Sequence, residues 1–148
     1  MNYGKITFPP AELSIKTIDG QKYVWDNLRG RYLLLTPEEV VRRHAIAFLI
    51  SHCSVEPQTI AQEYPVSLNG TAQRADIVVV GRDLRPAILV ECKATDVKIT
   101  QQTLAQAIRY NSVLGARYIM LTNGESHFCY EVIDGKVSPM KGFPKMVY

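Results

Sequence analysis

The architecture of the chain is indicated most clearly by Arg74-Ala-Asp76-Ile-Val-Val-Val80, followed after a short loop by Ala87-Ile-Leu-Val-Glu91-Cys-Lys93. Both runs are rich in Ile, Leu and Val, which is typical of buried strands, and the loop between them contains Gly, Asp and Pro. The two runs therefore predict a hairpin. Facing residues of an antiparallel pair have numbers with a constant sum, and a turn centred in this loop places Asp76 opposite Glu91.

This register predicts a site for chemistry. Facing positions bring Cβ atoms to about 4.5–5.5 Å, where two carboxylates repel unless one is protonated or a cation lies between them. Residues two apart on a strand share a face, so Lys93 projects on the same side as Glu91. Carboxylate oxygens, carbonyls and water are the ligands that Mg²⁺ prefers, and an ammonium beside a metal and a phosphodiester can orient the attacking water. The trio of Asp76, Glu91 and Lys93 thus fits phosphodiester hydrolysis.

Length and composition restrict the class of protein. The chain has 148 residues, 47% hydrophobic and 21% charged, as in a single globular domain that can bury its own core. No apolar run approaches the length of a membrane span, and no basic-then-apolar leader is present, so we expect a soluble cytoplasmic protein with no membrane partner. The three cysteines are too few and too scattered for a disulfide framework or a zinc ribbon, so a metal would need oxygen ligands.

The remaining pattern predicts an α/β (α+β) fold with a mixed central sheet flanked by helices. An N-terminal β-hairpin is expected around Asp19-Gly20, within an extension over residues 1–31. The elements expected after it are a helix capped by Thr36 and reaching about Ser51, strands over 60–68, 74–80 and 87–93, a helix over 101–114, and strands over 118–122 and 127–132. We expect one domain over 1–148, with its core over 35–124 and a C-terminal strand and tail over 125–148.

At this point the sequence resembles a known superfamily. Asp76, Glu91-Cys92-Lys93 and the helix segment Gln106-Ala-Ile-Arg-Tyr110 are similar to the PD-(D/E)XK nucleases, which carry Asp and (Glu/Asp)-x-Lys on a sheet and often Gln-x-x-x-Tyr on the next helix. More narrowly, the chain resembles the N-terminal nuclease domain of type I restriction enzyme R proteins. The segments that carry this narrower likeness are Leu35-Thr-Pro-Glu-Glu-Val-Val-Arg42, Arg74-Ala-Asp-Ile-Val-Val, Leu89-Val-Glu-Cys-Lys-Ala94, 106–111 and Leu121-Thr-Asn-Gly124.

The resemblance implies a magnesium-dependent DNA endonuclease with a restriction-endonuclease-like fold, in which Mn²⁺ can replace Mg²⁺. Asp76 and Glu91 would be metal ligands, the Cys92 carbonyl would be available as a further ligand, and Lys93 would stand next to the attacking water. The resemblance also implies partners: DNA, and either subunits of a restriction-modification system or a second copy of the chain. The sequence has no Gly-x-x-x-x-Gly-Lys-(Ser/Thr) phosphate loop, so the translocating motor of a complete R subunit is not within it.

A glutamate on the first helix often joins the site in this superfamily, and the matching residue here is Glu39 or Glu38. Glu39 lies three residues after Thr36, where a helix capping box explains it equally well. Glu38 has no such second explanation, so both assignments stay open.

Other candidates come from the second helix and from basic residues. Gln102, Gln106 and Tyr110 recur at helical spacing and predict a polar stripe, which a solvated helix face would also produce. The family pattern assigns Gln106 to site support and Tyr110 to the site or the substrate backbone.

Arg42, Arg43 and Arg74 are candidate contacts to DNA phosphates. The net charge of +3 permits a polyanionic partner without identifying one, and arginines on an ordinary surface would look the same.

Two alternatives to an enzyme remain. The same fold could serve as a catalytically silent module that binds DNA or a partner. The acidic pair and Lys93 could also form only a surface ion network in a structural or regulatory protein.

Overall fold

The computed structural model describes residues 3–148 and contains two α-helices, one short 3₁₀ helix and nine strands within that range. Along the chain these are β1 (Ile15–Ile18), β2 (Gln21–Asp26), β3 (Arg31–Leu34), α1 (Pro37–His52), η1 (Pro57–Thr59), β4 (Ile60–Leu68), β5 (Thr71–Val80), β6 (Pro86–Cys92), α2 (Gln101–Leu114), β7 (Tyr118–Thr122), β8 (His127–Ile133) and β9 (Lys136–Pro139). The α+β class predicted from the sequence is confirmed.

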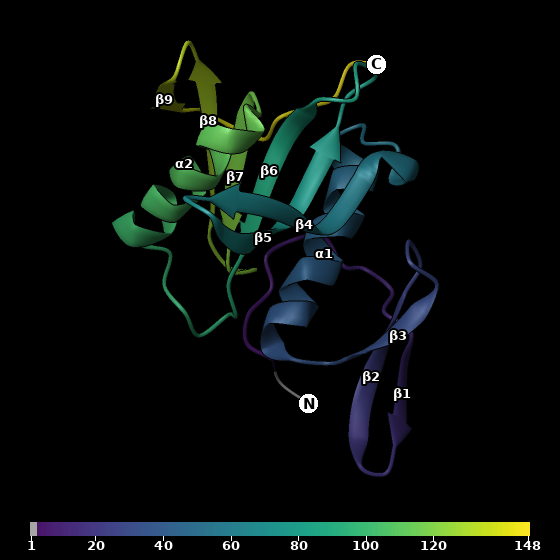
Figure 1. Ribbon diagram of the computed structural model, residues 1–148. Helices are drawn as coiled ribbons and strands as arrows, with labels where there is room; N and C mark the ends of the chain where they lie inside the picture. The colour runs from purple at the N-terminus through teal and green to yellow at the C-terminus, as the bar shows by residue number, and fades with distance from the viewer. Residues whose placement is uncertain (1–2) are drawn as a thin grey trace.

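The strands form two separate sheets. The larger has the order β4-β5-β6-β7-β8-β9, in which only the β6–β7 pair is parallel, because α2 connects these two strands and returns the chain to the same end. The smaller is the antiparallel sheet β1-β2-β3. Figure 1 shows α1 and α2 flanking the larger sheet, and the smaller sheet projecting away from it.

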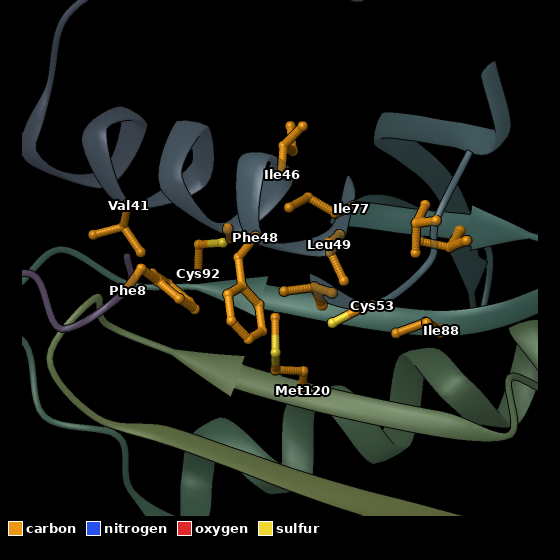
Figure 2. Close-up of a cluster of buried hydrophobic side chains, with 14 of the residues drawn as sticks. Phe8, Val41, Ile46, Phe48, Leu49, Cys53, Ile77, Ile88, Cys92 and Met120 are labelled. Atoms are coloured by element: carbon orange, nitrogen blue, oxygen red, sulfur yellow. The ribbon is translucent and has the colours of Figure 1, made fainter. Parts of the chain in front are cut away.

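Each helix covers one face of the larger sheet. On one face, α1 contributes Val41, Phe48 and Leu49 to a core that includes Ile88 and Met120, as Figure 2 shows. On the other face, α2 buries residues against Leu89 and Ile119. Leu49 is fully buried, so truncating it to alanine would cost about 2–5 kcal/mol of stability. These two layers hold the strand that ends in Glu91 and Cys92 firmly between them.

Helix boundaries follow the predicted capping signals. Thr36 is the N-cap of α1 and its side chain accepts a hydrogen bond from the Glu39 N–H, with Pro37 at the first helical position. Thr100 caps α2 in a reciprocal arrangement with Thr103, and Gly115 ends that helix with a positive φ of 70°. The capping of α1 fixes where its first turn, with Glu38 and Glu39, meets the sheet.

Two strands were not expected from the sequence. The N-terminal element is a three-stranded sheet rather than a hairpin, because residues 31–34 pair with β2 as β3. Their run of apolar residues lacks the alternation that marks a half-buried strand. The C-terminal tail also contains β9, which pairs with β8 around Asp134-Gly135. That dipeptide is a favoured hairpin turn, so the signal for β9 was present in the sequence.

A buried ionic network joins the small sheet to the rest of the protein. Asp26, at the end of β2, is fully buried and pairs with Arg29 at 2.6 Å and with Arg43 of α1 at 2.9 Å. Gln62 of β4 donates to the same carboxylate and accepts from Arg43. Burial opposes ionisation, but these donors outweigh it and lower the pKa of Asp26 to about 2. The network therefore anchors β2 to α1 and β4.

Over residues 3–148, neither helix has the length and apolar character that a membrane crossing requires.

Candidate active site

The two predicted carboxylates meet where the C-terminal end of β6 lies beside the middle of β5. These strands pair with Ile77 opposite Val90, and the same register continued by one residue places Asp76 opposite Glu91, as the sequence predicted. The Cys92 N–H donates to Asp76 Oδ2 at 2.8 Å, and the Asp76 N–H donates to Glu91 Oε2 at 3.4 Å. Backbone at or next to each acidic residue thus donates a hydrogen bond to the carboxylate of the other.

The neighbouring strand explains why the Asp76 N–H is available. In β4, Gln62 pairs with Ile77 and Tyr64 with Ala75, but the intervening Glu63 makes no ladder pair with Asp76. Glu63 has a φ of 52°, a conformation that costs a residue with a Cβ roughly 1–3 kcal/mol. The break in the ladder leaves the Asp76 N–H free of β4, and it takes the Glu91 carboxylate as its acceptor instead.

The strand also changes the face it presents at this point. Residues two apart on a regular strand share a face, yet Ala75 packs in the α2-side core and Ile77 in the α1-side core. Asp76 therefore lies at a bend in β5, where its carboxylate is half-buried rather than enclosed by either layer.

Glu91 is buried, and its hydrogen bonding is incomplete among the described residues. Its side chain is 7% exposed, and among the described residues its Oε1 atom has no hydrogen-bond donor. Burial first, and the adjacent Asp76 carboxylate second, raise the pKa of Glu91 well above its ordinary value. Either a proton or a cation can relieve this pair.

The donor set matches a hard cation that keeps much of its water. Asp76 and Glu91 supply carboxylate oxygens, and the Cys92 carbonyl points toward β5 because its N–H does so. Over residues 3–148, no three His, Cys, Asp or Glu side chains are grouped to hold a metal. Mg²⁺ commonly takes only one or two carboxylates and fills its shell with water, so two acids and a carbonyl fit it.

Lys93 follows directly after β6. Its N–H donates to the Thr122 carbonyl at 2.9 Å, which keeps the backbone aligned beside β7. Its ammonium lowers the pKa of both Glu91 and Glu38 against the effect of their burial, so it lies in the field of both carboxylates. The lysine is therefore electrostatically coupled to the acidic pair, and its role beside a bound metal stays a prediction.

The structure separates the two glutamates of α1. Burial, followed by the charge of Asp76, raises the pKa of Glu38, so Glu38 is within the electrostatic influence of Asp76. The carboxylate of Glu39 instead pairs with Arg42 at 3.2 Å and Arg43 at 2.9 Å. The expectation of Glu39 in the site is corrected, because its side chain is directed into an arginine network, and Glu38 stays the candidate from this helix.

Arg42 also differs from its expected role. Its side chain is 10% exposed and pairs with Glu39 and Glu63, so it is not presented to a phosphate. Burial opposes its charge, but Glu39 and Asp76 raise the pKa of Arg42, which makes it an internal counter-charge. Arg43 is likewise buried. Arg74, 72% exposed and paired with Glu63 at 3.2 Å, remains open to an external partner.

Gln106 and Tyr110 of α2 form a hydrogen-bonded group with Gln73 of β5. Tyr110 is 5% exposed, and its hydroxyl accepts from Gln106 Nε2 at 3.0 Å and donates to Gln73 Oε1 at 3.4 Å. Burial and then Glu91 raise the pKa of Tyr110. A direct contact of Tyr110 with DNA is therefore corrected, because the helix turns this position toward the sheet together with Ala107.

Sequence reasoning missed Glu63 and Gln73. Glu63 bonds to Arg29, Arg42 and Arg74 from its place opposite Asp76, and Gln73 holds the Tyr110 hydroxyl. The only signal in the sequence concerns Glu63: two consecutive polar residues, Gln62 and Glu63, interrupt the β4 segment.

Comparison with known proteins places the chain. A family model described as type I restriction enzyme R protein N terminus matches residues 37–144. A solved fragment from Vibrio vulnificus YJ016, assigned as an HsdR subunit of a type I restriction enzyme, is similar in fold with a TM-score of 0.57 and 23% identity. The match covers 75% of this chain and 24% of that one, so the chain spans about a quarter of that structure. No curated protein matches. The chain belongs to the family of type I restriction enzyme R protein N-terminal domains.

Proposed function

We propose that this chain is a metal-dependent DNA endonuclease whose chemistry is carried by Asp76, Glu91 and Lys93. The observation that best supports this is that Asp76 and Glu91 lie next to each other. One carboxylate oxygen of this pair, Glu91 Oε1, is buried and has no hydrogen-bond donor among the described residues. Placing two carboxyl groups together in this way is costly for the folded protein, and groups with such perturbed ionisation cluster at functional sites. Membership of the R-protein N-terminal family supports DNA as the substrate and a restriction-modification setting, with companion subunits or a second copy as partners.

The residues divide the work of phosphodiester hydrolysis. Asp76 and Glu91, with the Cys92 carbonyl, would hold Mg²⁺ or Mn²⁺. The bound ion would polarise the phosphate and make a coordinated water more acidic. Lys93 would orient the attacking water and offset charge that develops on the phosphate oxygens. Glu38 adds a further carboxylate beside Asp76.

The surrounding residues keep this arrangement in place. Gln106 and Tyr110 fix the α2 side of the pair through hydrogen bonds to each other and to Gln73. Arg42 balances Glu39, Glu63 and Asp76 from the α1 side. Arg74 is exposed and can meet the phosphate backbone of the substrate.

A cleavage assay with a matched lysine control tests the proposal. Wild-type protein, Lys93→Ala and Lys98→Ala are incubated with supercoiled plasmid in Mg²⁺, Mn²⁺ or EDTA. Lys98 is exposed five residues further on, so its removal deletes the same charge outside the site. We expect cleavage only with metal, a loss of about 100-fold or more in Lys93→Ala, and little change in Lys98→Ala.

Two results would contradict the proposal. Equal cleavage by wild type and Lys93→Ala would remove the lysine from the mechanism. Binding of DNA without turnover in any metal would favour the alternative of a silent binding module.

A further inference from the structure

One face of the small sheet carries exposed and half-buried aromatic side chains that the proposed cleavage site does not use. The register pairs Lys16 with Tyr23, Tyr23 with Leu34, and Trp25 with Tyr32, so these residues share one face. The face is composed of Lys16, Ile18, Gln21, Tyr23, Trp25, Tyr32 and Leu34, which we call the aromatic face.

The aromatic side chains lie next to one another. Trp25 and Tyr32 occupy facing positions with ring centroids 4.9 Å apart at 63°, and Lys16 Nζ stands 4.0 Å above the Tyr32 ring. Tyr32 is 40% exposed, and Tyr23 and Trp25 are half-buried. Trp25 also lines an apolar recess of about 440 Å³ between the N-terminal segment and α1. The cluster is therefore open on its outer side.

The charge on this face has one sign. Lys16 is its only charged residue, and none of its positions is Asp or Glu. The acidic residue inside the sheet, Asp26, is on the opposite face and is neutralised by Arg29 and Arg43. A ligand that combines flat apolar rings with negative charge would complement this surface.

We propose that the aromatic face binds single-stranded DNA, with unpaired bases stacking on Tyr32 and Trp25 and a phosphate meeting Lys16. Aromatic side chains accept any base in this way, whereas in a duplex the bases are already stacked on each other and their faces are closed. The chain passes from β3 through Leu35 and Thr36 directly into the helix that begins with Glu38. Binding of single-stranded DNA on this sheet does not require the proposed cleavage site to be active.

The sequence contains one tryptophan, and it is Trp25, so its fluorescence reports on this surface. Wild-type protein in EDTA is titrated with oligo-dT of about 12 nucleotides and with a blunt duplex of equal length. We expect saturable quenching by oligo-dT and at least about 5-fold weaker binding of the duplex. EDTA removes the metal that the proposed cleavage requires, so binding measured in this way is separated from the proposed cleavage function.

Variants identify the residues responsible. Tyr32→Ala should weaken oligo-dT binding about 5-fold to 100-fold, while Tyr32→Phe, which keeps the ring, should bind as wild type. Lys16→Ala should make log K less steep in log [salt] by about 0.7. Phe128→Ala, which removes an aromatic ring 44% exposed on β8, serves as the control and should not change binding. Far-UV circular dichroism verifies that each variant is folded.

The proposal is overturned by any of three results. Trp25 emission could be unaffected by oligo-dT, the duplex could bind as well as the single strand, or Tyr32→Ala could bind like wild type. Self-association that Tyr32→Ala abolishes, with no oligonucleotide binding, would assign the face to a second copy of the chain.

Discussion

The Cys92 N–H donates to Asp76 Oδ2 at 2.8 Å, so the carboxylate of Asp76 is oriented by the backbone of the residue between Glu91 and Lys93. The side chain of Cys92 points the other way, into the α1-side core, and is 2% exposed. The backbone of Cys92 therefore positions the Asp76 carboxylate, while its side chain packs beneath α1.

This separation predicts that the thiol is not a metal ligand. Cys92→Ala should keep metal-dependent cleavage within about threefold of wild type, while losing about 1–2 kcal/mol of unfolding free energy because it truncates a buried side chain. Urea denaturation and plasmid cleavage measure the two effects. A Cys92→Ala protein that folds normally but no longer responds to metal would show that the sulfur coordinates the ion.

The acidic pair predicts a dependence of stability on pH. The folded state raises the pKa of Glu91 above its ordinary 4.5, so above that pH the folded protein binds a proton that the unfolded chain has released. Stability is then lost as pH rises toward the folded pKa, by at most about 1.4 kcal/mol per pH unit. Glu91→Gln removes this slope, so its stability relative to wild type should increase between pH 5 and 8. Parallel denaturation curves across that range would contradict the assignment.

The glutamates of α1 should have different effects when replaced. Glu38→Gln should reduce cleavage with little change in stability, because Glu38 lies beside Asp76 and Lys93. Glu39→Gln should cost about 1.5–3 kcal/mol, since it removes one carboxylate partner from each of the buried Arg42 and Arg43, while Glu63 and Asp26 remain paired with them. Denaturation and initial cleavage rates for both variants test this. The reverse pattern would restore Glu39 to the site.

The ionic network predicts acid sensitivity at the base of the small sheet. The pKa of Asp26 is lowered from 3.8 to about 2, so its contribution to stability is fully present above about pH 4 and is lost as pH falls through 2. Asp26→Asn should be less stable than wild type at pH 7, and the difference should shrink near pH 2. Asp134→Asn, in the exposed turn before β9, is the control and should match wild type throughout. If Asp26→Asn were less stable than wild type by the same amount at pH 7 and near pH 2, the negative charge of Asp26 would not be the source of the stabilisation.

The sequence allowed the acidic pair to be located because its geometry is local. A short loop fixes the register of β5 and β6, and alternation along β6 puts Glu91 and Lys93 on one side, so counting residues suffices. The capping signals of both helices were local in the same sense, with Thr36 and Thr100 confirmed.

What sequence reasoning missed depends on distant neighbours. In the sequence, Arg42 cannot be told from a surface arginine, because its partner Glu63 lies on another element. Tyr110 fits a polar stripe with Gln106, but the rotation of α2 on the sheet turns it inward. The positive φ of Glu63 has no signal in its residue type, because glutamate seldom adopts that conformation.

An anomalous difference map from crystals grown with MnCl₂ would show whether Asp76 and Glu91 bind a metal ion. We expect one strong peak at coordination distance, about 2.0–2.3 Å, from carboxylate oxygens of both Asp76 and Glu91, and its loss in Asp76→Asn crystals. A map with no peak at this pair, obtained from protein that cleaves DNA in the same manganese concentration, would contradict the assignment of these residues as the metal site.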